Sequence, residues 1–116
     1  MRFPLPGGET VHRLRAAVAV DAYGDETRDW ATAERVTVAG CAMAPTVEPE
    51  FHQAGRDGVE VGWTLYAPFD TDVTAYDRIE HPTYGLFEVD GDPGKWRSPF
   101  SGLEAGTTVR LRRIEG

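Results

Sequence analysis

The chain has 116 residues, the usual size of one domain, so we expect a single core over residues 1–116. Acidic residues outnumber basic ones by 19 to 12, and the net charge of -7 argues against a protein that grips DNA through its phosphates. The one cysteine, Cys41, excludes a disulfide framework and is expected to be a buried thiol. No apolar stretch is as long as the apolar region of a signal peptide or as a membrane span. We therefore expect the protein to be made and kept in a reducing cytoplasm, without a membrane partner.

The first predicted strand is Thr10–Val20, where apolar residues alternate with a period of two. The alternation separates one face from a second face that carries two arginines: His12, Leu14, Ala16, Val18 and Val20 against Val11, Arg13 and Arg15. Residues 21–25 are typical of a turn with a glycine. A second strand is expected at about Trp30–Cys41, and a short helix over residues 26–34, capped by Thr27, is the alternative to its uncertain start.

Residues 42–58 have no stable period and contain two prolines and two glycines. We expect a long loop of roughly 15 residues here, which exceeds the usual connection length and is typical of functional segments. Four more strands are expected at Val59–Tyr66, Asp77–Glu80, Tyr84–Val89 and Thr107–Ile114. Six short strands joined by Gly/Pro turns predict an all-β fold, a small antiparallel barrel or sandwich.

The charge is unevenly distributed along the sequence. Residues 1–20 carry +2, residues 21–47 carry -3, residues 48–92 carry -9 and residues 93–116 carry +3. The middle of the chain is therefore acidic, and both ends are mildly basic.

No pattern in the sequence indicates an enzyme. The histidines lack partners at a recognised metal spacing, so we expect no metal site. Asp70, Asp72, Asp77 and His81 are the only candidates for acid–base chemistry, and we interpret the acids as turn residues of a polar connection after Pro68. No nucleophile motif or glycine-rich phosphate loop of recognised form is present. We therefore expect neither catalysis nor a cofactor.

One aromatic pair differs from the aromatic residues expected in the core. Trp96 and Phe100 lie in a segment rich in glycine and proline, with Arg97 between them. This composition is typical of an interface anchor. The alternative is that both rings cover the open end of the barrel.

Four segments, in this order, resemble the head-closure proteins of long-tailed double-stranded DNA phages, also called head-to-tail stoppers. They are residues 58–66 (GVEVGWTLY), 77–79 (DRI), 91–102 (GDPGKWRSPFSG) and 109–113 (VRLRR). The likeness covers roughly residues 10–116, is most specific at 91–102, and is greatest to versions from phages of actinobacteria.

The resemblance implies a homo-oligomeric ring, a hexamer or a dodecamer, in the neck of a virion made in a bacterial cytoplasm. The ring would sit beneath the portal and adaptor rings, and a tail terminator or tail tube would dock on its other face. The long loop would enter the channel and help close it after DNA packaging, which makes its polar residues candidates: Glu48, Glu50, Phe51, His52, Gln53 and Arg56. Candidates for ring or tail interfaces are Trp96, Arg97, Pro99, Phe100, Arg110 and Arg112.

The acidic balance is compatible with this role, because a channel lined by carboxylates repels phosphate and lets duplex DNA slide without sequence-specific binding. Two other readings remain open. One is a tail-terminator ring protein, which would lack the long loop. The other, from a different class, is a small-ligand-binding β-barrel that uses Trp96 and tyrosine side chains.

Overall fold

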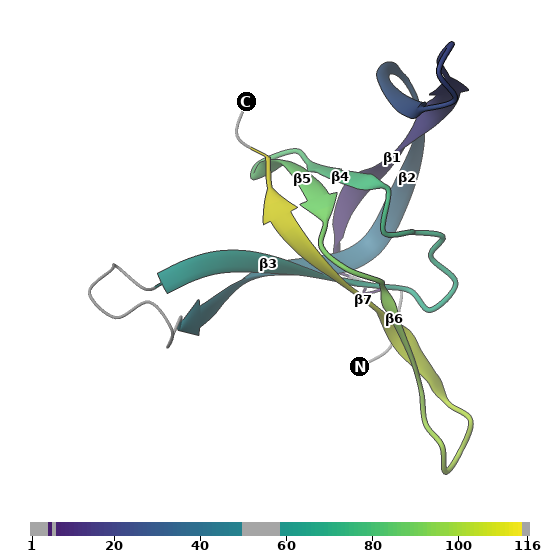
Figure 1. The fold of residues 1–116 in the computed structure, drawn as a ribbon. Coiled ribbons are helices and arrows are strands. Elements are labelled where there is room, and N and C mark those ends of the chain that lie inside the picture. Colours follow the sequence, from purple (N-terminus) through teal and green to yellow (C-terminus); the bar gives the residue numbers. More distant parts are fainter. Residues whose placement is uncertain (1–4, 6, 50–58, 115–116) are drawn as a thin grey trace.

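The computed structural model describes residues 5, 7–49 and 59–114, which form an antiparallel all-β fold, as predicted (Figure 1). No helix occurs in these ranges. The strands are β1 (Glu9–Val20), β2 (Glu26–Pro49), β3 (Val59–Ala67), β4 (Arg78–His81), β5 (Gly85–Val89), β6 (Gly94–Arg97) and β7 (Glu104–Arg113). Strand β6 is additional to the expected six, because its four residues lie in a segment rich in glycine and proline, which shows no period of two.

The seven strands form one sheet with the order β3-β2-β1-β4-β5-β7-β6. A further pairing joins β3, at one end of this order, to β7, the last strand but one. Six strands therefore surround a core as a hydrogen-bonded ring, and β6 extends the sheet beyond β7.

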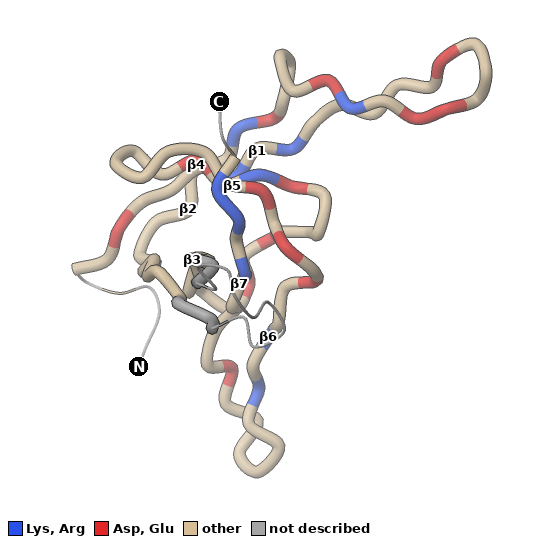
Figure 2. Tube along the Cα trace, turned by 60° about the vertical axis from the view of Figure 1, so that its left-hand side comes forward, with Lys and Arg blue, Asp and Glu red and all other residues tan. Residues whose placement is uncertain are grey.

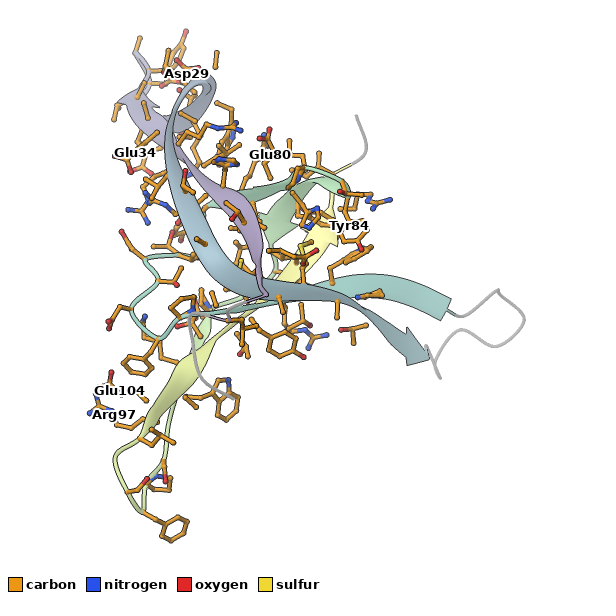
Figure 3. All side chains as sticks on the ribbon, turned by 180° about the vertical axis from the view of Figure 1, so that it is seen from behind. Asp29, Glu34, Glu80, Tyr84, Arg97 and Glu104 are labelled. Carbon is orange, nitrogen blue, oxygen red and sulfur yellow. The ribbon has the colours of Figure 1, made fainter. Side chains whose placement is uncertain are left out.

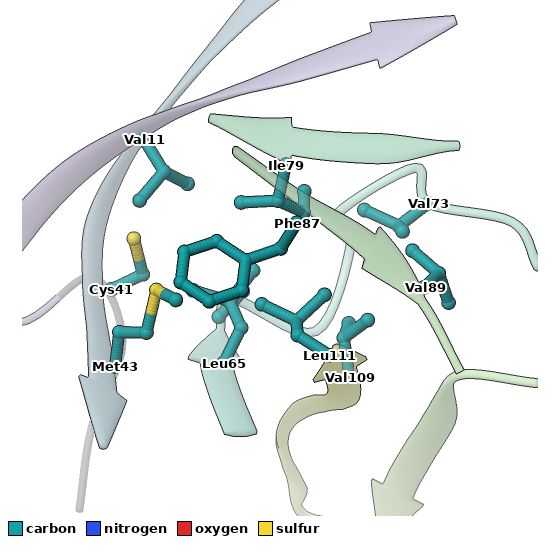
Figure 4. Packing of buried hydrophobic residues seen from close by; sticks show 11 residues of the cluster. Val11, Cys41, Met43, Leu65, Val73, Ile79, Phe87, Val89, Val109 and Leu111 are labelled. Atoms are coloured by element: carbon teal, nitrogen blue, oxygen red, sulfur yellow. The ribbon is translucent and has the colours of Figure 1, made fainter. Parts of the chain in front are cut away.

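The core fills the inside of this ring (Figure 4). Its centre is Phe87, which is fully buried and meets Trp63 edge to face, with 5.5 Å between the ring centroids. The alternation of residues 107–114 predicts that Val109 and Leu111 face inward and that Arg110 and Arg112 face outward. Both Val109 and Leu111 are buried, which confirms the inward face. The other buried members are Val11, Cys41, Met43, Leu65, Ala67, Val73, Ile79 and Val89.

Strand β1 turns its less apolar face to the interior. Val11 and Arg13 are 0% and 3% exposed, whereas His12 and Leu14 on the opposite face are only partly buried. The alternation of apolar residues alone could not identify the buried face of β1, because that face carries Arg13. The ion pair with Glu34 compensates the charge of Arg13 and so allows its burial.

Residues 26–34 belong to β2, so the alternative of a short helix is wrong. The turn before them sets the pairing, because the Asp21 carboxylate accepts the backbone N–H groups of Tyr23 and Asp25 at 2.8 and 2.9 Å. The hairpin then pairs Val20 with Glu26, and this tertiary pairing overrides a weak helical signal.

The predicted loop over residues 42–58 is wrong in its first half. Residues 42–49 continue β2 and pair with residues 59–66 of β3, and residues 50–58 lie outside the described part of the chain. The two prolines in this segment favoured a loop over a strand in the sequence. Proline is tolerated on a strand edge, and the described residues give this part of β2 a strand neighbour on one side only.

The sequence predicts an extended N-terminal arm over residues 1–9, and its described residues, 5 and 7–9, contact β2 near Gly40. Leu5 donates its backbone N–H to the carbonyl of Gly40 at 2.9 Å. Gly8 packs so closely that a Cβ on it would lie 2.8 Å from the carbonyl carbon of Gly40. Residues 1–4 and 6 of this predicted arm lie outside the described residues.

Three hairpins, β1–β2, β2–β3 and β6–β7, project from the core in different directions (Figure 1). The radius of gyration is 16.3 Å. A compact chain of this length would have a radius of about 13 Å. We call residues 16–33 the β1–β2 arm and residues 94–107 the β6–β7 arm.

Candidate functional site

A cluster of ion pairs joins β1 to the connection between β3 and β4. Nε and Nη2 of Arg15 donate to the carboxylate of Asp77 at 3.0 and 2.9 Å. Nη1 and Nη2 of the same side chain donate to Asp72 at 3.1 and 3.2 Å. One guanidinium thus binds two carboxylates through paired hydrogen bonds.

The two carboxylates differ in their surroundings. The Asp77 side chain is 1% exposed and also accepts the backbone N–H of Thr74 at 2.8 Å, whereas that of Asp72 is 71% exposed. Hydrogen bonds from Arg15 hold the pKa of Asp72 below its ordinary value of 3.8, so Asp72 is ionised at neutral pH. The hydrogen bonds that Arg15 makes with Asp77, and after them those with Asp72, raise the pKa of Arg15 above its ordinary value. The cluster is suited to holding this connection in place against β1.

Beside this cluster, Arg13 is buried with an incomplete set of hydrogen bonds. Its Nη2 lies 2.5 Å from a carboxylate oxygen of Glu34. Its Nη1 is buried without a hydrogen-bond partner among the described residues, and it lies 3.8 Å from a carboxylate oxygen of Asp72. A buried unpaired donor costs stability, so this atom calls for an acceptor.

Arg13 forms part of the wall of an open groove with a volume of about 440 Å³, which we call the Arg13 groove. One side is β2, whose residues 36–38 pair with β1, and the other is the segment that follows β3. Apolar side chains and two acids line it, and the full set is Arg13, Val36, Thr37, Val38, Ala39, Pro68, Asp70, Thr71 and Asp72.

The β6–β7 arm carries the most exposed aromatic side chain in the described residues. Phe100, at its tip, is 97% exposed, and Trp96 and Leu103 are 61% and 66% exposed. Neither Trp96 nor Phe100 covers the core, so the alternative that the two rings cover an open end is wrong. Trp96 is fixed by a hydrogen bond from its Nε1 to Oγ1 of Thr108 at 2.7 Å.

The basic interface candidates have partners within the chain. Arg97 pairs with Glu104 across the β6–β7 arm at 2.6 Å, where both lie side by side (Figure 3). Arg112 pairs with Glu88 of β5 at 2.5 Å. Arg110 points outward from β7, as predicted. Pro99 lies at the tip of the arm, next to Phe100.

The candidates of the predicted channel loop are placed only in part. The backbone of Glu48 lies in β2 and pairs with Glu60 of β3. Glu50, Phe51, His52, Gln53 and Arg56 lie outside the described residues.

His81 is buried and held in a single orientation. Its Nδ1 accepts the backbone N–H groups of Thr83 and Tyr84 at 3.0 and 3.1 Å, so the ring proton resides on Nε2, which faces Glu9 at 3.2 Å. His81 is thus a turn-forming residue. Among the described residues, no three potential metal ligands gather in one place. Burial raises the pKa of the Cys41 thiol, consistent with the predicted structural role.

A second hollow, of about 250 Å³, lies at the base of the β6–β7 arm. Tyr66, Trp96 and Leu103 line it together with residues 105–108 of β7. Its aromatic lining suits a small apolar or ring-shaped ligand. In the described residues, no helix has the length and apolar character needed to cross a membrane.

Sequence reasoning missed the parts played by Arg13, Arg15 and Glu34. The sequence did contain one signal, since Val11 shares a strand face with the two arginines. Arginines are rare on an interior face unless acidic residues pair with them. The partners come from positions 21 to 62 residues away, which no local pattern identifies. Comparison with known proteins found no matching family model and no matching curated protein.

Proposed function

We propose that the protein is a structural virion protein, a ring-forming head-to-tail stopper that joins the portal and adaptor rings of a phage to its tail. One observation carries the assembly part of this proposal: a small core extends hairpins with large apolar side chains exposed at their tips, of which Phe100 is 97% exposed. Such side chains are typical of surfaces that a partner covers. The phage assignment rests on the segment resemblance, above all at residues 91–102.

The shape is suited to a ring subunit. The β2–β3 hairpin projects away from the core and leads to residues 50–58, which contain most of the residues expected in the channel loop (Figure 1). Several copies around one axis would bring these segments together, because symmetry repeats each element once per subunit.

The charge distribution supports a channel through which DNA passes. Acidic residues outnumber basic ones along much of the chain, and three of them, Asp21, Asp25 and Glu26, lie at the end of the β1–β2 arm (Figure 2). A ring with such subunits repels phosphate, so the barrier to DNA escape is steric.

The decisive experiment removes the gene from the phage. Without the protein, heads are expected to fill with DNA, to lose that DNA and to lack tails. The purified protein is expected to form annular particles in electron micrographs. Deletion of residues 50–55 should preserve rings and weaken DNA retention. Stably filled, tailed particles without the protein would refute the proposal, and copurification with tail tubes but not with heads would favour a tail-terminator ring.

The hollow lined by Tyr66, Trp96 and Leu103 supports a second candidate function, binding of a small ligand. Calorimetric titration with sugars and small aromatic metabolites tests it. Saturable binding that Trp96→Ala abolishes would favour this candidate.

A further inference from the structure

We propose that the connection between β3 and β4 is a strap with two positions, because two arginines compete for the carboxylate of Asp72. In the structure, Asp72 accepts hydrogen bonds from Arg15, and in the second position it accepts from Arg13. The inference goes beyond the proposed function, because it concerns contacts within a single chain and holds whether or not the chain forms a ring.

Arg13 has a donor that solvent cannot satisfy. Its Nη1 is buried without a hydrogen-bond partner among the described residues. Oδ2 of Asp72 belongs to the same chain and already lies 3.8 Å from this nitrogen. A shift of about 1 Å would bring the two atoms to an ordinary hydrogen-bond distance. Asp72 is therefore the acceptor that can pair with Nη1 of Arg13.

Arg15 can release Asp72 with little loss of stability. Its Nε and Nη2 remain bound to Asp77 at 3.0 and 2.9 Å. Its bonds to Asp72 are longer, 3.1 and 3.2 Å, and the two side chains are 35% and 71% exposed. Water can replace a lost hydrogen bond at such a surface, whereas it cannot reach the buried donor of Arg13. The move therefore exchanges a bond that solvent replaces for one that it does not.

The neighbours of Asp72 limit how much of the connection shifts. Val73, directly after it, is 9% exposed and packs in the core. Before it, the carbonyl of Phe69 accepts from Oγ1 of Thr107 at 2.9 Å. Residues 70–72 are therefore the part that moves between the two positions.

This movement narrows the Arg13 groove. Residues 70–72 line one side of the groove, and Val36 lies on the other. Arg13 is opposite Val36 in the register of β1 and β2. When Asp72 moves from Arg15 to Arg13, its side of the groove approaches the side formed by β2.

Lys95 links the strap to the β6–β7 arm. Its Nζ donates to the carbonyls of Phe69 and Thr71 at 2.7 and 3.2 Å, so it holds the residue next to Asp72. A partner that binds the exposed tip and tilts the arm would also move Thr71. Two sites are coupled when both bias one element that has two positions. The strap is such an element, and it couples the arm to the groove.

The test lengthens the side chain of Asp72. Asp72→Glu adds one carbon–carbon bond, roughly 1.5 Å, which is more than the shift that the contact with Arg13 requires. In relaxation-dispersion NMR, backbone amides of residues 70–73 in the wild type are expected to show exchange on the microsecond-to-millisecond timescale. Asp72→Glu is expected to abolish this exchange and to shift the side-chain resonances of Arg13. Asp72→Ala, which leaves no acceptor for either arginine, is expected to abolish the exchange without that shift.

The matched control is Asp70→Glu, which lengthens another acid on the same side of the groove and is expected to leave the exchange unchanged. Circular dichroism checks that every variant is folded. Three results would overturn the inference: a wild type without exchange at residues 70–73, exchange that persists in Asp72→Ala, or equal effects of Asp70→Glu and Asp72→Glu.

A separate variant tests the link to the arm. Lys95→Met keeps the aliphatic stem and removes Nζ, so the populations of the two positions are expected to change while the exchange persists. Unchanged populations would refute the link to the arm. All these measurements use the purified chain, so their failure is distinct from a failure of the proposed function, which the gene deletion decides.

Discussion

At the scale of single residues, the conspicuous feature is the number of charges near the interior. Arg13 and Asp77 are 3% and 2% exposed, and they are held by Glu34 and Arg15. Burying a charge lowers the stability of the fold unless the charge is paired. Removing one member of such a pair therefore leaves the other as an unpaired buried charge. These residues fix the connection after β3 against β1, and that connection forms one wall of the Arg13 groove.

We therefore expect Asp77→Asn to destabilise the fold by about 2 kcal/mol. The value is below that of a fully enclosed pair because the Arg15 side chain is 35% exposed. Urea denaturation should give a lower midpoint with an unchanged slope. Asp72→Asn is the control, since the Asp72 side chain is 71% exposed, and it should change the midpoint little. Equal midpoints for the two variants would contradict this account of the cluster.

At the scale of elements, the first half of β2 is shaped by contacts that a strand pattern does not contain. The register passes from Arg15 opposite Glu34 to Ala17 opposite Asp29, so β2 bulges between these pairs. The carboxylate of Asp29 stabilises the bulge by accepting the backbone N–H of Ala31 at 3.0 Å. Polar residues in such a bulge blur the period of two, which is why the start of this strand was uncertain from the sequence.

The β1–β2 arm is braced where it leaves the core. The guanidinium carbon of Arg78 lies 3.9 Å from the centre of the Trp30 ring, and that of Arg28 lies 4.5 Å from the centre of the Tyr76 ring. Each contact joins the arm to β4 or to the turn before it. We infer that these two cation–π contacts limit the motion of the arm.

Trp30→Ala should loosen the arm without unfolding the core. Losing one cation–π contact corresponds to about 0.5–1 kcal/mol, so amide hydrogens of residues 17–29 should exchange about 2–5-fold faster. Hydrogen exchange followed by mass spectrometry measures this. Tyr23→Ala at the 90% exposed tip is the matched control and should leave the exchange unchanged. Faster exchange throughout the core would show that Trp30 supports the whole fold instead.

At the scale of the whole molecule, the core and the arms have separate tasks. The core is a compact cluster inside the strand ring, whereas the arms extend the molecule to 50 × 41 × 31 Å. Stability therefore depends on few side chains. Residues at the arm tips are available for contacts with other chains.

A pair of phenylalanine variants separates these tasks. Phe87→Ala removes the fully buried ring at the centre of the core and should cost about 3–5 kcal/mol, a large part of the 5–15 kcal/mol typical of a domain. Phe100→Ser, at the 97% exposed tip, should change the stability of the monomer by less than about 0.5 kcal/mol. Thermal unfolding compares them, and a similar loss in both variants would contradict the division.

The sequence by itself determined the fold class, five of the seven strands in close outline, and the inward face of β7, because a period of two is a local property of the backbone. It also singled out Trp96 and Phe100 as residues outside the core. Only the tertiary structure decided which face of β1 is buried, how far β2 extends, and that Arg13, Val36 and Pro68 form one groove. Those features depend on ion pairs and strand neighbours between residues far apart in the chain, and such pairings leave no periodic trace in the sequence.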